Sequence, residues 1–186
     1  MTKNPSNTKS TYSIRTMTLV ALMTAVCCIL SPISVPIGPV PISLSVLAVF
    51  LTACVLGSKR GVTAVILYIL LGLIGMPVFT GYEAGPGKLF GPTGGYIIGY
   101  IPLVLLAGCT VGRFGIRKWY IHAAAMLAGL VSCYTLGTIW FMIVTKTSLR
   151  DALLLCVVPF IAFDLMKMVT AFIVGNTIRR AISAIS

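Results

Sequence analysis

Acidic side chains are scarce in this chain. Its 186 residues include only three carboxylates, Glu83, Asp151 and Asp164, against 14 Lys and Arg. Charged residues make up 9% of the sequence, whereas a soluble domain carries about 25%. Hydrophobic residues make up 58%, and the mean hydropathy is +1.05. This composition excludes a sizeable soluble domain and indicates an integral protein of the lipid bilayer.

The same scarcity narrows the chemistry that the chain can perform. A glycosidase-type acid pair needs two carboxyl groups in one site, and the three here are dispersed along the chain. His122 is the only histidine, so a His-based triad or metal site lacks partners. None of the six cysteines stands in a CxxC or zinc-type spacing. We therefore expect no catalytic residue, no metal and no resident cofactor.

Nucleotide and nucleic-acid sites are also disfavoured. The stretch Gly85-Pro86-Gly87-Lys88 resembles a phosphate-binding loop, but Tyr82 stands where that motif needs glycine, and Leu89 where it needs Ser or Thr. The chain therefore cannot hydrolyse ATP alone, and active transport would draw on a partner or an ion gradient. Lys and Arg lie at the ends of apolar runs rather than in one basic groove, so we expect no nucleic-acid binding.

The chain divides into a polar tail and a series of apolar segments. Residues 1–13 are polar and predict a disordered cytoplasmic tail. Residues 14–186 predict a single all-α membrane domain with six transmembrane helices, each needing about 20 apolar residues or slightly fewer. These helices are expected at residues 14–30, 43–57, 61–75, 94–112, 120–144 and 152–178. Proline-rich residues 31–42 and Gly/Pro-rich residues 76–93 predict loops.

Loop charge predicts the orientation. With the N-terminus inside, ten Lys and Arg fall in cytoplasmic segments, and only Lys88, Lys146 and Arg150 fall in external ones. This bias matches the positive-inside rule, so both termini are expected in the cytoplasm. The loops at 31–42 and 76–93 then share the external face, where they can roof a site that is open to the outside.

Asp164 and Lys167 interrupt the last apolar segment. An ionisable side chain at the centre of a membrane helix costs roughly 2.5 to 3.5 kcal/mol. The i,i+3 spacing places both side chains on one helix face. One interpretation is a polar binding site that faces the interior of the bundle. The other is a plain ion pair that fixes the last helix, although a buried pair is weak evidence for stability.

Small residues and aromatics supply further candidates. Ala21 and Ala25 are four apart on the first helix, and such pairs let another helix approach closely, either inside the bundle or from a partner. Similar pairs are Gly95/Gly99, Gly108/Gly112 and Ala124/Ala128. Phe79, Tyr82, Phe90 and Tyr96 flank the Gly-rich loop, where aromatics either form an interfacial belt or wall a ligand pocket.

Four stretches closely resemble the BioY family, the biotin-specific substrate-capture (S) components of energy-coupling-factor transporters. They are LGLIGMPVF at 71–79, GPTGGYIIGY at 91–100, VPIGPVP at 35–41 and FDLMK at 163–167. The resemblance implies a six-helix S-component bundle in the bacterial cytoplasmic membrane that captures biotin from outside. It also implies docking to a transmembrane scaffold subunit bound to two ATPases, with Ala21 and Ala25 as the contact face.

With biotin as the ligand, Asp164 would accept from a ureido N–H, and Lys167 would donate to the ureido carbonyl or the valerate carboxylate. The expected apolar walls are Phe79, Tyr82 and Tyr96. Gly91 and Gly94 either admit the ligand to the backbone or permit close helix entry. Thr93 either contacts the ligand or caps the fourth helix. The alternatives are an S component for another vitamin, a secondary carrier, although no inverted repeat is visible, and a membrane enzyme.

Overall fold

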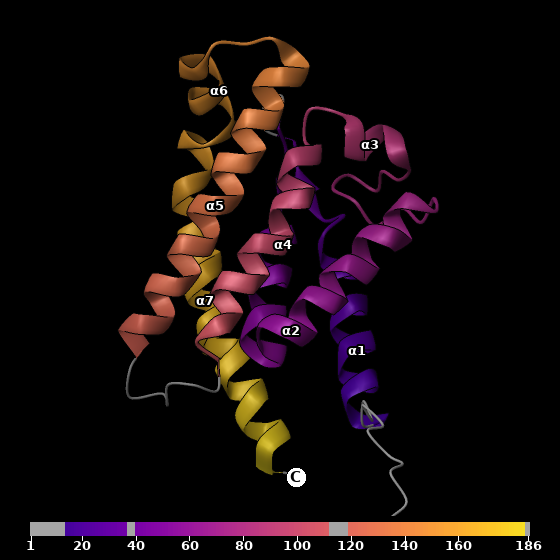
Figure 1. Ribbon diagram of the computed structural model, residues 1–186, viewed down its shortest axis with the longest axis vertical. Coiled ribbons are helices and arrows are strands. Elements are labelled where there is room, and N and C mark those ends of the chain that lie inside the picture. The colour runs from indigo at the N-terminus through magenta and orange to yellow at the C-terminus, as the bar shows by residue number, and fades with distance from the viewer. Residues whose placement is uncertain (1–13, 37–39, 112–118, 185–186) are drawn as a thin grey trace, which may run out of the picture.

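The computed structural model describes residues 14–36, 40–111 and 119–184 as a helical bundle (Figure 1). The helices are α1 Ile14–Leu30, α2 Ser45–Leu73, α3 Pro86–Phe90, α4 Gly94–Cys109, α5 Trp119–Thr145, α6 Leu149–Cys156 and α7 Val158–Ala184. Two short strands, β1 Ser34–Val35 and β2 Ile42–Ser43, pair antiparallel. The start of α1 and the end of α7 lie at the same end of the molecule (Figure 1). The predicted disordered tail, residues 1–13, lies outside the described residues.

Helix α2 contains both the second and the third predicted segments. Gly57 breaks it with φ 74° and ψ −173°, a backbone conformation that is open essentially to glycine alone. The chain turns sharply there, so α2 has two arms, 45–56 and 58–73 (Figure 1). The expected basic turn at residues 58–60 is therefore helical, and Gly57 makes the turn instead.

The last predicted segment is not one helix. It is divided into α6 and α7 at Val157, which has φ −122° and ψ −57°. Pro159 lies in the first turn of α7 and has no N–H to donate to a carbonyl of the preceding turn. The prediction of a single helix over 152–178 missed this break, although a proline in an apolar run is its usual cause.

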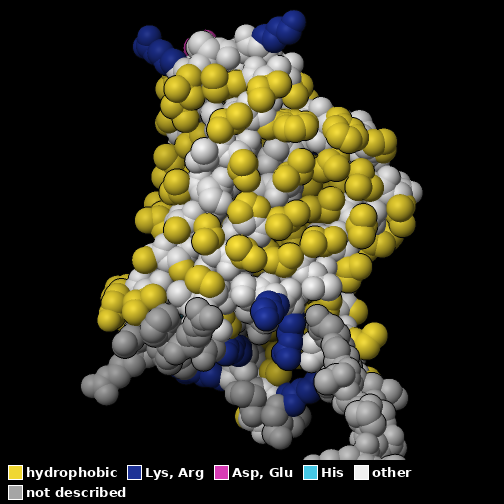
Figure 2. All heavy atoms as spheres, in the orientation of Figure 1, with side chains coloured by type: hydrophobic (Ala, Val, Ile, Leu, Met, Phe, Trp, Pro, Cys, Tyr) yellow, Lys and Arg dark blue, Asp and Glu magenta, His cyan; other side chains and the backbone are white. Residues whose placement is uncertain are grey.

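The outer surface is that of a membrane protein. By length and composition α5 and α7 can each cross a membrane, as can α2 when its two arms are counted together, while α1 and α4 are shorter apolar helices. Each of the six predicted segments is helical over most of its length, and three helices of the described residues qualify as spans by length and composition. Hydrophobic side chains cover the middle of the face in Figure 2, and Lys and Arg side chains gather at its two ends. Lipid is the solvent that such a surface requires.

Helix α4 packs between α2 and α5, and glycines allow the close contacts. A Cβ on Gly95 would lie 2.2 Å from Trp140 Cβ, and one on Gly99 would lie 3.0 Å from Cys133 Sγ. A Cβ on Gly108 would meet the Ser58 nitrogen at 2.5 Å. These glycines serve packing inside the bundle. The alanine pairs behave differently, because all four of their side chains are exposed: Ala21, Ala25, Ala124 and Ala128.

Both long loops contain regular structure and touch each other. The proline-rich loop carries the β1–β2 pair, and the Gly-rich loop carries α3 together with a bridge between Phe79 and Glu83. The Gly81 nitrogen donates to the Pro32 carbonyl at 3.1 Å, which links one loop to the other. The prediction of irregular loops was therefore incomplete, since local pairing satisfies part of their backbone.

Candidate functional site

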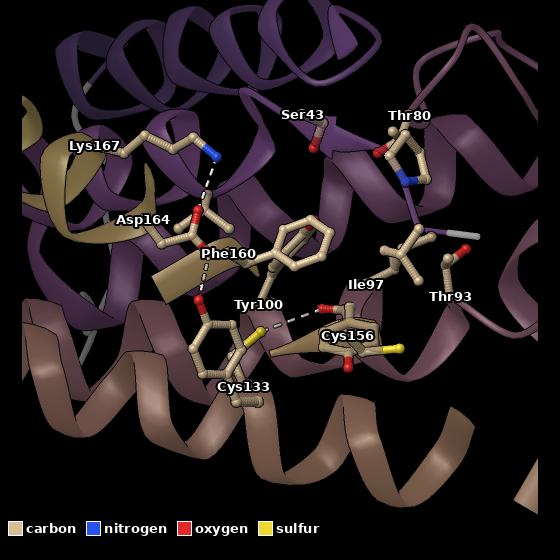
Figure 3. Close-up of a pocket in the computed structure, with 15 residues that line it drawn as sticks. Ser43, Thr80, Thr93, Ile97, Tyr100, Cys133, Cys156, Phe160, Asp164 and Lys167 are labelled. Atoms are coloured by element: carbon tan, nitrogen blue, oxygen red, sulfur yellow. Dashed lines mark hydrogen bonds and ion pairs between the residues drawn. The ribbon is translucent and has the colours of Figure 1, made fainter. Parts of the chain in front are cut away.

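A cavity lies among α4, α5 and α7, beside the two long loops (Figure 3). Its volume is about 60 Å³, which is room for a few water molecules. Small-ligand sites usually measure about 300–1,000 Å³, so this cavity is small for a ligand site. The lining residues are Val40, Pro41, Ser43, Val46, Thr80, Thr93, Tyr96, Ile97, Tyr100, Cys133, Tyr134, Cys156, Phe160, Asp164 and Lys167.

Asp164 and Lys167 occupy one end of this cavity. They belong to a buried stripe on α7 at helical spacing, which also includes Phe160 and Ala171. Asp164 is 2% exposed and Lys167 is 9% exposed, whereas Met166 between them is 69% exposed. The expectation that the pair faces the interior of the bundle is confirmed, and exposed apolar residues such as Met166 lie on the outer face of α7.

The two charges are paired with each other and with a third side chain. Lys167 Nζ donates to Asp164 Oδ1 at 2.7 Å. The Tyr134 hydroxyl, on α5, donates to Asp164 Oδ2 at 2.7 Å. Each carboxylate oxygen can accept more than one hydrogen bond, and an ammonium has three donors. The cluster therefore keeps both donor and acceptor capacity for a polar ligand.

The remainder of the lining separates polar from apolar groups. Ser43, Thr80 and Thr93 lie across the cavity from the ion pair, and the rings and methyls of Phe160, Tyr100 and Ile97 lie between them (Figure 3). A ligand that fits this arrangement has hydrogen-bonding groups at its two ends and an apolar middle.

Two predicted contact residues, Thr93 and Tyr96, line the cavity together with the ion pair. Thr93 is the N-cap residue of α4, but its side chain makes no capping hydrogen bond. Of the two roles considered for Thr93, the structure thus favours contact with the contents of the cavity. The Tyr96 hydroxyl shares a hydrogen bond with Thr138 Oγ1 at 3.3 Å, which holds the ring at the cavity wall.

Phe79 and Tyr82 do not line the cavity, which corrects the prediction that they wall the pocket. Phe79 is fully buried and packs edge-on against Tyr68, with ring centroids 5.8 Å apart. It also covers Gly72, where an added Cβ would lie 2.1 Å from the ring. Tyr82 is 68% exposed and has φ 59°, so the turn carries its side chain away from the bundle.

Gly91 and Gly94 are likewise absent from the lining. The Gly91 carbonyl accepts a hydrogen bond from Trp140 Nε1 at 3.0 Å, which fastens this stretch to α5. A Cβ on Gly94 would lie 1.6 Å from the Leu89 carbonyl oxygen. Of the two roles considered for these glycines, the structure supports close entry of the chain into α4 and not approach to a ligand.

Sequence reasoning missed Tyr134, Tyr100 and Phe160. Phe160 lies four residues before Asp164 on the same helix face, so helical spacing alone could have found it. Tyr134 and Tyr100 lie inside apolar segments of other helices, and no motif marks them.

Histidine, cysteine and carboxylate side chains are the groups that could hold a metal ion. Among the described residues no group of three metal-ligating side chains occurs, and the six cysteines are free thiols.

The helical bundle, its apolar surface and its buried polar cavity define a multi-pass membrane protein with an internal polar site. A family model described as the BioY family matches residues 2–184, and the chain belongs to this family. A biotin transporter BioY of Thermotoga maritima is 37% identical over 90% of this chain and 97% of its own length. BioY2 of Lactococcus lactis subsp. cremoris is 38% identical, covering 90% and 91%.

A solved structure gives the same result for the fold. The crystal structure of the S-component for biotin from an ECF-type ABC transporter is 30% identical to this chain. It aligns with a TM-score of 0.83 over 90% of this chain and 92% of that one. The predicted S-component bundle is thereby confirmed.

Proposed function

We propose that this protein is the biotin-binding specificity subunit of an energy-coupling-factor transporter, and that it captures biotin from the outside. The observation that carries this proposal is the buried Asp164–Lys167 pair facing a cavity whose middle is apolar. The matched family and the named relatives support it. A transporter subunit of this kind binds its solute without transforming it, so catalytic residues are not required.

The chemistry of biotin suits the two ends of the cavity. Its ureido ring presents two N–H donors and a carbonyl, and Asp164 with Lys167 offers the complementary acceptor and donor. The thioether-containing bicycle and aliphatic chain suit Phe160, Tyr100 and Ile97. The valerate carboxylate would then reach the hydroxyls of Thr80 and Thr93, or Lys167 as the alternative. Because the cavity is smaller than biotin, binding must displace part of its lining.

The orientation and the partners belong to the same proposal. Arg179 and Arg180 belong to the last turns of α7, whose end lies at the same end of the molecule as the start of α1 (Figure 1). The positive-inside rule assigns this basic end to the cytoplasm. The loop that carries α3 lies toward the opposite end, which this orientation assigns to the outside (Figure 1). Val40 and Thr80, one from each long loop, are among the cavity-lining residues. The exposed pair Ala21 and Ala25 on α1 would contact the scaffold subunit with its two ATPases in the bacterial cytoplasmic membrane.

Substitution of Asp164 tests the ligand assignment. Asp164→Asn removes the charge that would accept the ureido N–H, and hydrogen bonds to charged groups contribute about 1.5–3 kcal/mol. We expect the Kd for biotin, measured by equilibrium titration of the purified protein, to rise at least tenfold. Glu83→Gln removes a carboxylate on the exposed loop and should leave the affinity unchanged. An unchanged affinity in Asp164→Asn refutes the assignment.

A double substitution separates ligand binding from a purely structural ion pair. Asp164→Leu with Lys167→Met replaces the buried charges by apolar side chains of similar size, which is often neutral or stabilising. We expect this variant to stay folded, by thermal melting, and to lose biotin binding. If it binds biotin as the unmodified protein does, the pair serves only to fix α7.

A further inference from the structure

A second hollow lies at the end of the molecule opposite the loops, where α2 turns and α4 ends. Its volume is about 290 Å³. The α2 turn contributes Leu56, Gly57, Ser58, Lys59 and Arg60, and the end of α4 contributes Gly108, Cys109 and Val111. None of these residues belongs to the cavity that holds the ion pair.

The hollow is basic, and no carboxylate side chain in the described part of the chain neutralises it. Lys59 and Arg60 are both exposed. The three side-chain carboxylates of the whole sequence lie elsewhere: Glu83 bonds Lys88, Asp164 bonds Lys167, and Asp151 lies in the first turn of α6. Among the described residues no carboxylate pairs with Lys59 or Arg60, so both are available to an external anion.

The two backbones that bound the hollow are fixed. A Cβ added to Gly108 would lie 2.6 Å from the Gly57 carbonyl carbon, so the α2 turn and the end of α4 are in direct contact. Gly57 itself holds a positive φ of 74°. The two basic side chains are thus presented beside a preformed depression and not on a loose loop.

An apolar stripe leads from the middle of the membrane to this hollow. Ile98, Leu105 and Cys109 share one face of α4 by their spacing of seven and four, and all three are exposed. Ile98 and Leu105 face outward where lipid chains pack. A molecule with hydrocarbon chains and an anionic head could lay the chains along this stripe and place the head beside Lys59 and Arg60.

We propose that this hollow binds the phosphate group of an anionic phospholipid from the leaflet at the basic end of the bundle. Basic pockets between transmembrane helices on the cytoplasmic side are suited to anionic headgroups. A free phosphate ion would pair with the basic side chains but would leave the apolar stripe uncovered. The geometry therefore favours a phospholipid as the source of the phosphate group. This inference is independent of the ligand of the internal cavity.

Native mass spectrometry of the delipidated full-length protein tests the proposal, with phosphatidylglycerol and phosphatidylcholine titrated separately. The unmodified protein should bind one phosphatidylglycerol more tightly than phosphatidylcholine. Lys59→Gln with Arg60→Gln should weaken phosphatidylglycerol binding on the order of tenfold or more. The matched control, Lys146→Gln with Arg150→Gln, removes equal charge at the opposite end and should leave that binding unchanged. An equal loss in both variants, or no preference between the lipids, overturns the proposal.

Three further arms define the site. Cys109→Trp keeps every charge but fills the hollow, and it should also lower phosphatidylglycerol binding. Lys59→Arg with Arg60→Lys should retain the lipid, which separates lost charge from lost fold. Inorganic phosphate at millimolar concentration should fail to displace the lipid. Displacement by phosphate would reassign the hollow to a free anion, and full binding in Cys109→Trp would reduce it to a flat charged surface.

Discussion

At the level of single residues, Tyr134 completes the polar cluster that Asp164 and Lys167 begin. One carboxylate oxygen accepts from Lys167 and the other from Tyr134, both at 2.7 Å. Two donors from two helices therefore fix the plane of the carboxylate before any ligand arrives. Such pre-orientation reduces the ordering that binding would otherwise require.

Tyr134→Phe tests this orienting role. The substitution removes only the hydroxyl, leaving Asp164 Oδ2 without its described donor, and a hydrogen bond to a charged group contributes about 1.5–3 kcal/mol. We expect the Kd for biotin to rise about tenfold in an equilibrium titration, which corresponds to about 1.4 kcal/mol. Tyr120→Phe, at an exposed tyrosine of the same helix, is the control and should bind normally. Equal affinities in both variants would show that the Tyr134 hydroxyl does not help to hold the ligand.

The sequence predicted the charged part of the cavity better than the aromatic part. Asp164 and Lys167 could be predicted because an ionisable group in hydrocarbon needs a reason to be there. Phe79 and Tyr82 were selected because they flank the Gly-rich loop in sequence, and flanking a loop does not decide which way a ring points. Tyr134 carried no signal, since one hydroxyl hardly changes the apolar character of its segment.

At the level of helices, glycines decide how closely α4 and α5 approach and therefore where the cavity wall stands. A Cβ on Gly137 of α5 would lie 2.2 Å from Tyr96 Cδ1, and Tyr96 lines the cavity. A Cβ on Gly129 would lie 2.8 Å from the Leu103 carbonyl, away from the lining. The α4–α5 interface thus contains Gly137, which contacts a cavity-lining residue, and Gly129, which is remote from the cavity.

Gly137→Ala and Gly129→Ala should therefore differ in their effects. Overpacking a tight contact costs about 1–3 kcal/mol, so both variants should unfold at a lower temperature than the unmodified protein. Unfolding is measured by the chemical labelling of thiols such as Cys27 and Cys54, which are buried in the folded protein. Only Gly137→Ala should also weaken biotin binding, because Tyr96 must shift. Equal affinities for biotin in the two variants would indicate that the position of Tyr96 does not matter for binding.

Helix boundaries were predictable where apolar runs ended at basic or polar residues, and less so where the backbone turns inside a run. The α1 prediction coincides with Ile14–Leu30, and the α5 prediction differs from Trp119–Thr145 by one residue at each end. Gly57 and Pro159 each interrupt an apolar stretch without changing its hydropathy. A hydropathy pattern does not report such interruptions, and the residue types that cause them must be considered separately.

At the level of the whole molecule, some small residues pack inside the bundle, whereas others remain exposed on its surface. The contacts among α2, α4 and α5 bury Gly95, Gly99 and Gly108. Ala21 and Ala25 on α1 remain exposed, and so do Ala124 and Ala128 on α5. In a membrane, an exposed small pair is available to another helix, because close packing drives helix association there. The proposed function assigns the α1 pair to the scaffold subunit.

Tryptophan substitutions at the two pairs separate docking from lipid exposure. Ala21→Trp with Ala25→Trp should leave biotin binding intact, because no residue of α1 lines the cavity in the described structure. It should lower the amount of scaffold subunit that co-purifies by on the order of tenfold, since overpacking a close contact costs about 1–3 kcal/mol. Ala124→Trp with Ala128→Trp adds the same bulk on α5 and should not affect co-purification.

The pattern across both variants is decisive because each pair has the same spacing and exposure. If both variants lose the scaffold subunit, the added bulk acts through the bundle as a whole and not through a particular face. If neither loses it, α1 packs only against lipid and its own bundle, and docking must use another surface. Loss in the α1 variant alone, with the Kd for biotin unchanged, places capture and assembly on separate surfaces of one small bundle.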